Sequence, residues 1–358
     1  MAEKVTIGNC ELWHGDCRES MRELIAHGMK VQMCVTSPPY FGLRDYGHDG
    51  QLGLESTPAE YVANMVEVFG LVRDLLADDG VLWLNLGDSY ARSAGDDSTK
   101  VTDGGMKTGR TGIGEKLFRS GNNKPPLGLK PKDLIGIPWR VAFALQADGW
   151  YLRQDIIWSK PNPMPESVTD RCTKSHEYIF MLTKSARYYY DNDAIKEPAI
   201  YAGLTGQDKS GYKDAQAFAG KHSKTDKQRG HSRRHAGFND RWDAMDKAEQ
   251  CGGMRNKRSV WEVATRPYSG AHFATFPPAL IEPCILATSR PGDSVLDPFF
   301  GSGTTGQVAQ SLGRDWIGCE LNKNYHSLQM ERVNQLAIVF QDAKVVAGDT
   351  AVQEDWTK

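Results

Sequence analysis

A glycine-rich segment, 297–306, restricts the fold of this chain more than any other part of its sequence. It reads DPFFGSGTTG and lies between a short apolar run and a helical pattern; Gly301, Gly303 and Gly306 have the spacing G-x-G-x-x-G. Such glycines let the backbone approach a ligand closely, and the N–H groups at the start of the following helix then face that ligand. Glu320 lies 19 residues past the first glycine, and its carboxylate can accept hydrogen bonds from ribose hydroxyls. The segment predicts a nucleotide-binding turn, with an ordinary tight turn as the alternative, and it leaves both NAD and an adenosyl cofactor open.

Apolar runs alternate with helical patterns along the rest of the chain. Strands are expected at 31–35, 81–86, 151–158, 178–182, 294–296 and 316–319, and helices at 131–147, 277–288, 304–312 and 322–340. A further helix is expected to begin at the capping box of Thr57 and Glu60, with Pro58 in its first turn, and to be closed by Asp79 and Gly80. Strands that alternate with helices through short loops predict an α/β fold, with a parallel sheet covered on both faces.

Two stretches lack any core pattern. Residues 91–129 are rich in Gly, Ser, Asn and Lys, which is typical of a mobile loop. From 205 to 258, thirteen Lys and Arg accompany seven Asp and Glu; this segment carries +6 in a chain of net charge −2, so the remainder carries −8. This separation of charge suits a polyanion-facing insert on an acidic scaffold, and a solvated loop is the plainer alternative. We therefore divide the chain into a main domain, 1–200 with 259–358, and a basic insert, 201–258.

The composition excludes several classes of protein. The seven cysteines are scattered, with no Cys-x-x-Cys pair, which argues against a disulfide framework and against a zinc site. No run approaches the roughly 20 apolar residues that a membrane helix needs, and no apolar run follows the first four residues as in a signal peptide. We therefore expect a soluble protein of the cytoplasm that has no contact with a membrane.

A second motif, Thr36-Ser37-Pro38-Pro39-Tyr40, follows the apolar run 31–35. Two successive prolines stop a strand and force an extended loop, which places this loop at a strand's carboxyl end. Together with 297–305, it resembles the β-type amino-methylating DNA methyltransferases, which use S-adenosylmethionine and whose catalytic tetrapeptide precedes the cofactor loop. The resemblance covers most of residues 5–335 and includes Gly15-Asp16, 157–162, His176-Glu177, 259–261, 272–277 and 318–320.

The resemblance implies a Rossmann-like fold, a twisted and mostly parallel sheet with one antiparallel hairpin and helices on both faces. It also implies that the two motifs, some 260 positions apart, converge at one site. The cofactor-binding residues that it implies are Asp16, Phe276, Asp297, Phe299, Gly301, Ser302, Gly303, Thr304 and Glu320, with no metal. The main domain is then the catalytic domain, and the basic insert is the target-recognition region for double-stranded DNA, with Arg229, Arg233 and Arg234 as candidate DNA contacts.

The chemistry implied for the serine-proline loop is localisation of an amine lone pair. An exocyclic amine is a poor nucleophile because its lone pair is delocalised into the ring, and the Ser37 hydroxyl and the Pro38 carbonyl can accept its two protons. Pro39 keeps the loop rigid, and Tyr40 stacks on the base, which must first be flipped out of the duplex. The loop 91–129 either closes over the DNA or is simply disordered.

Several alternatives stay open. Family members with Ser-Pro-Pro-Tyr tend to modify N4 of cytosine, which we favour, but N6 of adenine is not excluded. Methylation at C5 needs a cysteine nucleophile, and Cys284 falls in an apolar helical pattern typical of a buried thiol. An NAD-dependent oxidoreductase explains the glycines but not the serine-proline loop, and a non-catalytic DNA-binding protein or methylation of RNA or of protein glutamine is also open. The sequence does not decide the recognition site, a cognate restriction endonuclease, or whether the protein is a monomer or a homodimer.

Overall fold

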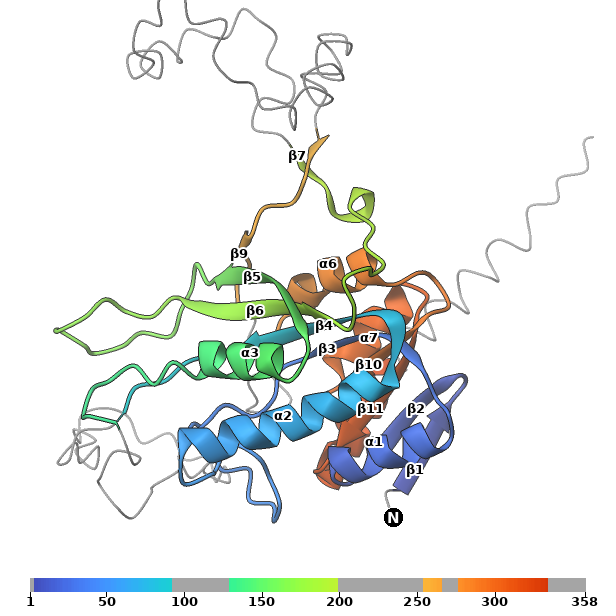
Figure 1. Cartoon of the computed structure of the whole chain (residues 1–358), viewed down its shortest axis with the longest axis horizontal. Coiled ribbons are helices and arrows are strands. Elements are labelled where there is room, and N and C mark those ends of the chain that lie inside the picture. The colour runs from blue at the N-terminus through green and yellow to red at the C-terminus, as the bar shows by residue number, and fades with distance from the viewer. Residues whose placement is uncertain (1–2, 92–128, 199–253, 266–275, 334–358) are drawn as a thin grey trace, which may run out of the picture. The chain divides into compact units, whose positions relative to one another are not determined.

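The computed structural model describes residues 3–91, 129–198, 254–265 and 276–333 (Figure 1). It comprises two compact units, one of Met1–Asp191 with Ser259–Lys358 and one of Asn192–Arg258. The predicted mobile loop, apart from its end residues 91 and 129, and the candidate DNA contacts Arg229, Arg233 and Arg234 lie outside the described residues. The boundary expected at residue 200 also lies outside them and stays a prediction.

The larger unit is built on a sheet whose described strands follow the order β1-β2-β11-β10-β3-β4-β6-β5-β9. These strands are β1 (Glu3–Ile7), β2 (Cys10–His14), β3 (Val31–Thr36), β4 (Leu76–Leu86), β5 (Tyr151–Ser159), β6 (His176–Thr183), β9 (Val260–Glu262), β10 (Ser294–Asp297) and β11 (Asp315–Glu320). Pairing is parallel from β2 through β11, β10 and β3 to β4, whereas β6 is antiparallel to both β4 and β5. The expected fold, mostly parallel with the hairpin of β5 and β6, is confirmed. The antiparallel pair of β1 and β2 at the sheet edge was not predicted.

Helices cover both faces of this sheet. Helices α1 (Cys17–Ala26), α2 (Pro58–Leu75) and α3 (Ile137–Ala147) pack in one layer, and α6 (Pro278–Thr288) and α7 (Thr304–Ser311) pack together on the other side (Figure 1). Alternation along β4 explains the arrangement, because Leu82 and Leu84 enter the core under α1 to α3, while Trp83 donates a 2.9 Å hydrogen bond from Nε1 to Thr288 of α6. Among the described residues, no helix is long and apolar enough to cross a membrane.

Helix α2 begins as predicted but ends earlier. Its N-terminus is capped by the Thr57 hydroxyl, which accepts a hydrogen bond from the Glu60 N–H. The expected end at Asp79 and Gly80 is wrong, because the helix ends at Leu75 and β4 begins at the next residue. Leu76 continues the helical spacing of apolar residues, but its backbone is extended and it pairs with Val31 of β3, so its burial comes from the sheet.

Helix α3 starts at Ile137, and the expectation of a helix from 131 is wrong for 131–136. The Asp88 carboxylate, from the loop after β4, accepts hydrogen bonds from the N–H groups of Gly136 and Ile137 and so fixes the helix start. Pro138 then lies in the first turn, where its missing N–H costs no hydrogen bond. A distant side chain therefore sets this boundary.

The smaller unit contains one described strand pair, β7 (Glu197–Pro198) with β8 (Met254–Arg255), and the short 3₁₀ turn η1 (Asp193–Ile195). The Glu197 carboxylate accepts hydrogen bonds from the side chains of Arg255 and Arg258, 2.9 and 2.8 Å long. These arginines are two of the thirteen basic residues counted in the segment 205–258, and each is paired with an acid. They are therefore weaker candidates for phosphate contacts than their charge suggested.

Candidate active site

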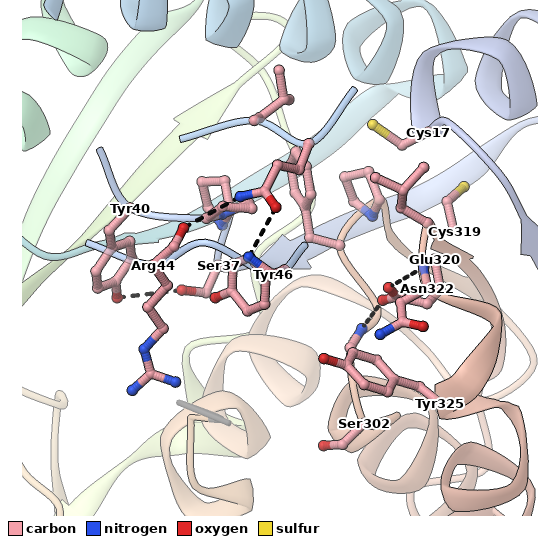
Figure 2. Close-up of a pocket in the computed structure, with 18 of the residues that line it drawn as sticks. Cys17, Ser37, Tyr40, Arg44, Tyr46, Ser302, Cys319, Glu320, Asn322 and Tyr325 are labelled. Carbon is pink, nitrogen blue, oxygen red and sulfur yellow. Dashed lines mark hydrogen bonds between the residues drawn. The ribbon is translucent and has the colours of Figure 1, made fainter. Parts of the chain in front are cut away.

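A pocket of about 330 Å³ opens at the carboxyl ends of the central parallel strands (Figure 2). Its walls come from the loops after β2, β3, β10 and β11, together with Asn85 of β4 and residues of the hairpin of β5 and β6. In an open α/β sheet this end of the strands is where ligands bind. Figure 2 shows Ser37 and Tyr40 on one side of the pocket, with Glu320 and Asn322 on the other. The two sequence motifs therefore line the same cavity.

A buried carboxylate ties the two motifs together. Asp297, at the end of β10, accepts hydrogen bonds of 2.6 Å from the hydroxyls of Thr36 and Thr305 and one of 3.0 Å from the Phe299 N–H. Burial raises the pKa of Asp297 to about 6, although these three donors oppose the rise. The side chain is 1% exposed, so its role in this structure is to hold the glycine turn against the end of β3.

Glu320 closes the glycine turn from the neighbouring strand. Its carboxylate accepts a 2.7 Å hydrogen bond from the Gly301 N–H and a 2.8 Å one from the Asn322 N–H, which leaves each oxygen a further lone pair. Burial raises the pKa of this carboxyl to about 7, against the lowering effect of the two N–H groups. Because Glu320 also lines the pocket, it can accept hydrogen bonds from a pair of ligand hydroxyls.

Asp16 stands at the start of α1 and lines the same end of the pocket. Its carboxylate accepts from the Arg18 N–H at 2.8 Å and forms an ion pair with the Arg18 guanidinium at 2.6 Å. Burial acts to raise the pKa of Asp16, but the hydrogen bonds and charge of Arg18 outweigh it and hold this pKa below its usual range. Asp16 is therefore an ionised acceptor at the pocket wall.

The remaining predicted cofactor residues divide into two groups. Phe276, Phe299, Gly301 and Ser302 line the pocket together with Asp16 and Glu320, whereas Asp297, Gly303 and Thr304 do not. Asp297 and Thr304 instead border a smaller adjacent cavity of about 50 Å³, and Gly303 caps α7 with a φ of 86°, a left-handed conformation that favours glycine. Contact of any of these residues with a cofactor stays a prediction.

The lining residues fit the adenosyl cofactor that the resemblance implies. Carboxylates at Asp16 and Glu320 supply acceptors for hydroxyl and amine groups, and Phe276 and Phe299 supply aromatic surface for a purine. The Gly301 N–H group is already bonded to Glu320, so this backbone is fixed without a ligand. Among the described residues, no group of three or more His, Cys, Asp or Glu could hold a metal ion.

The opposite wall contains a hydrogen-bonded chain of side chains. The Ser37 hydroxyl donates to the Tyr40 hydroxyl at 3.3 Å, and Tyr40 donates to Glu177 Oε2 at 2.7 Å. The Asn85 amide donates to the same Glu177 oxygen at 3.3 Å, and Lys160 forms an ion pair with the other. Burial, with the nearby Glu177 charge, raises the pKa of Tyr40 well above its usual range, so this phenol stays protonated.

Sequence reasoning assigned no role to Asn85, Lys160 and Glu177. Lys160 and Glu177 belonged to stretches that carried the resemblance, and Asn85 is the one polar side chain in the apolar run 81–86. A polar residue inside an apolar run is the sequence signal that could have pointed to Asn85, because a polar group inside a buried strand needs a hydrogen-bond partner. Arg44, Tyr46 and other residues of 43–52, with Asn322 and Tyr325, also line the pocket, and no sequence pattern pointed to them (Figure 2). Cys284, expected to be a buried thiol, is 1% exposed and lies in α6.

Comparison with known proteins identifies relatives over nearly the whole chain. The family model described as DNA methylase, which covers N6 and N4 methyltransferases, matches residues 31–331. The chain is 46% identical over 328 residues to the Type II methyltransferase M.SmaI of Serratia marcescens, and the aligned region covers 91% of each protein. It is 43% identical over 334 residues to the Type II methyltransferase M.Cfr9I of Citrobacter freundii, which covers 93% of this chain and 90% of that one.

Solved structures share the fold at lower sequence identity. The PvuII DNA methyltransferase, described as cytosine-N4-specific, superposes with a TM-score of 0.53 at 18% identity, over 91% of this chain and 87% of that one. A putative DNA modification methylase of Thermus thermophilus, complexed with S-adenosyl-L-methionine, superposes with a TM-score of 0.50 at 21% identity, over 90% and 94% of the two chains. Both likenesses support the α/β architecture described above.

Proposed function

The chain belongs to the N6/N4 DNA methylase family, and on that premise we propose that it methylates the N4 amine of a cytosine flipped out of double-stranded DNA. The enzyme is an S-adenosylmethionine-dependent DNA methyltransferase that acts on an exocyclic amine; the choice of cytosine is the proposal. Serine at position 37 supports it, because the resemblance associates Ser-Pro-Pro-Tyr with N4 of cytosine. N6 of adenine is the second candidate.

One observation carries the transfer between a bound base and a bound cofactor, the hydrogen bond that joins Thr36 to Asp297 and so brings the two motifs to one pocket. Thr36 precedes the serine-proline loop, and Asp297 opens the glycine turn, so this bond sets the distance between the base-binding and cofactor-binding walls. Both side chains are buried, which makes the link rigid. Such preorganisation is the main means by which a site can speed a transfer reaction that needs no covalent enzyme intermediate.

The cofactor is held, in this proposal, by the wall opposite Ser37. Glu320 accepts hydrogen bonds from the ribose hydroxyls, Asp16 accepts from a polar group nearby, and Phe276, Phe299, Gly301 and Ser302 enclose the rest. When bound, S-adenosylmethionine supplies an electrophilic methyl group on a sulfonium. Asp297, Gly303 and Thr304, which were also predicted to bind the cofactor, do not line this pocket, and direct cofactor contacts by them stay a prediction.

The base is held by the serine-proline loop. Because the Ser37 hydroxyl donates its proton to Tyr40, its oxygen lone pairs are left to accept from the target amine, and the Pro38 carbonyl accepts the second amine proton. The Tyr40 ring lies so close to Gly87 that a Cβ at that position would be 2.5 Å from Tyr40 Cε2. One edge of the ring is therefore fixed against Gly87, the residue that follows β4, and the ring lines the pocket where the base stacks.

DNA binding involves the basic insert in this proposal. Arg229, Arg233 and Arg234 are candidate contacts to phosphates or guanine edges, on their sequence alone. Arg44 adds positive charge at the pocket itself, whereas the charge of Lys160 is paired with Glu177. The relatives named Type II methyltransferases suggest a cognate restriction endonuclease as a partner. A monomeric or homodimeric state and a cytoplasmic location stay predictions.

The product of the reaction tests the proposal. The protein is incubated with unmethylated genomic DNA and S-adenosylmethionine, and the DNA is digested and analysed by nucleoside mass spectrometry. We expect N4-methylcytosine, and N6-methyladenine as the product would contradict the choice of base. Parallel reactions with RNA and with a glutamine-containing peptide are expected to give no methylation, and a Ser37→Ala protein serves as the control for traces of other enzymes.

A further inference from the structure

The methyl transfer proposed above leaves one proton to be removed. The amine nitrogen forms a bond to the methyl carbon with its lone pair, while the electrons of the broken carbon–sulfur bond leave with sulfur. The nitrogen then carries a positive charge and two protons, and the stable product, a neutral secondary amine, retains one. A group in the pocket must therefore take the other proton or pass it to solvent.

Three side chains form a directed path from the base-binding wall. Ser37 Oγ lies 3.3 Å from the Tyr40 hydroxyl, and the Tyr40 hydroxyl lies 2.7 Å from Glu177 Oε2 (Figure 2 shows the first bond). Each hydroxyl donates to the next group, so all the donors point from Ser37 toward Glu177. A chain of this polarity can accept a proton at Ser37 and deliver one at Glu177 without charge separation along the way.

Glu177 is the group in this network that can keep the proton. The Asn85 Oδ1 atom, 3.2 Å from the Tyr40 hydroxyl, is a second and more distant acceptor for the Tyr40 proton, but a neutral amide is not a base, and Lys160 is a cation. Tyr40 has a pKa raised well above its usual range, so it passes a proton but does not stay ionised. Among the described pocket residues, Glu177 is the one carboxylate hydrogen-bonded to Tyr40; the carboxylates of Asp16 and Glu320 have other partners.

Positively charged and titratable groups surround Glu177, and an ion pair holds its carboxylate in place. Lys160, which follows β5, pairs with Oε1, and its ammonium lies 4.3 Å from the centre of the Trp158 ring. Lys174 and His176, from the chain just before Glu177, also interact with its charge. The Glu177 side chain is 16% exposed, so a proton received there has a route to water.

We propose that Glu177 is the proton acceptor of the methyl transfer, reached through Ser37 and Tyr40. The amine N–H bond breaks, its electron pair stays on nitrogen, and its proton moves to Ser37 Oγ. The Ser37 hydroxyl proton moves to Tyr40, and the Tyr40 proton moves to Glu177, so that both hydroxyls end neutral and the carboxylate becomes a carboxylic acid. Loss of that proton to water then restores the site. This inference rests on the proposed amine methylation, whichever base carries the amine.

The test compares Glu177→Gln and Tyr40→Phe, alone and combined, with a Glu166→Gln control. Glu166 lies in the connection between β5 and β6, just before the strand that carries Glu177, and pairs with Arg171 at the surface, outside the network. We expect each relay variant to lower kcat roughly 10²-fold, with KM for DNA and the Kd for S-adenosylmethionine changed less than about 3-fold. The double variant should lose little more than either single one, because relay members act as a unit. The control should keep wild-type kcat.

The pH profile separates a relay from a structural role. The acidic side of the kcat profile should differ between the wild-type protein and Glu177→Gln, because the variant has no carboxylate at this position, while Lys160, Lys174 and His176 are present in both proteins. Glu177→Asp should recover part of the lost kcat, since it restores a carboxylate. Full kcat in Glu177→Gln, or a loss matched by weaker cofactor or DNA binding, would overturn the relay. Failure of the proposed base choice is distinct, because it changes the wild-type product and not the response to Glu177→Gln.

Discussion

The Thr36 hydroxyl donates a 2.6 Å hydrogen bond to Asp297, a residue 261 positions later in the chain. The two residues end β3 and β10, which are parallel neighbours at the centre of the sheet. Their carboxyl ends therefore meet, and the loops that follow them form the two walls of the pocket. The bond fixes the spacing on which transfer between a donor and an acceptor depends.

Removal of this bond should destabilise the protein more than removal of a surface hydroxyl. Thr36→Val keeps the shape of the side chain but leaves Asp297 Oδ1 with only the Phe299 N–H as a partner. We expect a loss of about 1–3 kcal/mol in the free energy of unfolding, measured by urea denaturation. Thr6→Val on the exposed face of β1 is the matched control and should change stability by less than about 0.5 kcal/mol. Equal effects of both substitutions would show that the buried hydrogen bond contributes no more to the free energy of unfolding than a surface hydroxyl does.

Gly87→Ala should disturb catalysis without disturbing the cofactor wall. The added Cβ would be 2.5 Å from Tyr40 Cε2, so the ring must move, and its hydroxyl with it. We expect kcat to fall at least roughly 10-fold and the free energy of unfolding to fall by about 1–3 kcal/mol, with cofactor affinity unchanged by calorimetry. Gly70→Ala in α2 meets nothing within 4 Å and should raise stability by about 0.5–1 kcal/mol. Normal turnover in Gly87→Ala would mean that the position of the Tyr40 ring does not matter.

The sequence predicted well those elements whose pattern is local. The strand ending at Thr36, the strand ending at Asp297 and the helix starting at Thr304 carry their own apolar spacing and turn residues, and all three occur in the structure. The start of β4 at Leu76 and the start of α3 at Ile137 could not be predicted in this way, because a neighbouring strand and a distant carboxylate set them.

The same distinction applies to the site. Ser37 and Gly301 were found because each belongs to a compact motif in the sequence. Asn85, Lys160 and Glu177 come together only because β6 pairs antiparallel with both β4 and β5, a register in which Trp158 lies opposite Glu177. No spacing along the chain encodes that pairing, so the network around Tyr40 emerges only in three dimensions.

Ser37→Ala and Glu320→Ala should separate the two walls of the pocket. Ser37→Ala removes an acceptor for the target amine, so we expect kcat to fall roughly 10²-fold while the Kd for S-adenosylmethionine stays within about 3-fold. Glu320→Ala removes the predicted acceptor for ribose hydroxyls and should raise that Kd roughly 10–100-fold. Calorimetric titration with the cofactor and steady-state kinetics on duplex DNA give both quantities. Equal loss of cofactor binding in the two variants would contradict the assigned roles.

The ionisation of Glu320 should make the stability of the cofactor-free protein depend on pH. Burial raises the pKa of this carboxyl from 4.5 to about 7, so the folded state favours the neutral acid. The resulting stabilisation is complete below pH 4.5 and is lost as the pH rises through about 7, where the folded protein must ionise a buried group. The loss corresponds to up to about 3 kcal/mol.

Glu320→Gln tests this dependence, because a glutamine stays neutral at every pH. The substitution costs one acceptor for the N–H groups of Gly301 and Asn322, which lowers stability by an amount independent of pH. Relative to the variant, the wild-type protein should therefore lose stability between about pH 5 and pH 8, as measured by urea denaturation at several pH values without cofactor. Asp297, whose pKa is also raised by burial, is present in both proteins, but its charge contributes to the raised pKa of Glu320, so only the part of its titration that is independent of Glu320 cancels in the difference. Two stability curves that stay parallel over this range would mean that Glu320 is ionised throughout, with its pKa near the ordinary value despite its burial.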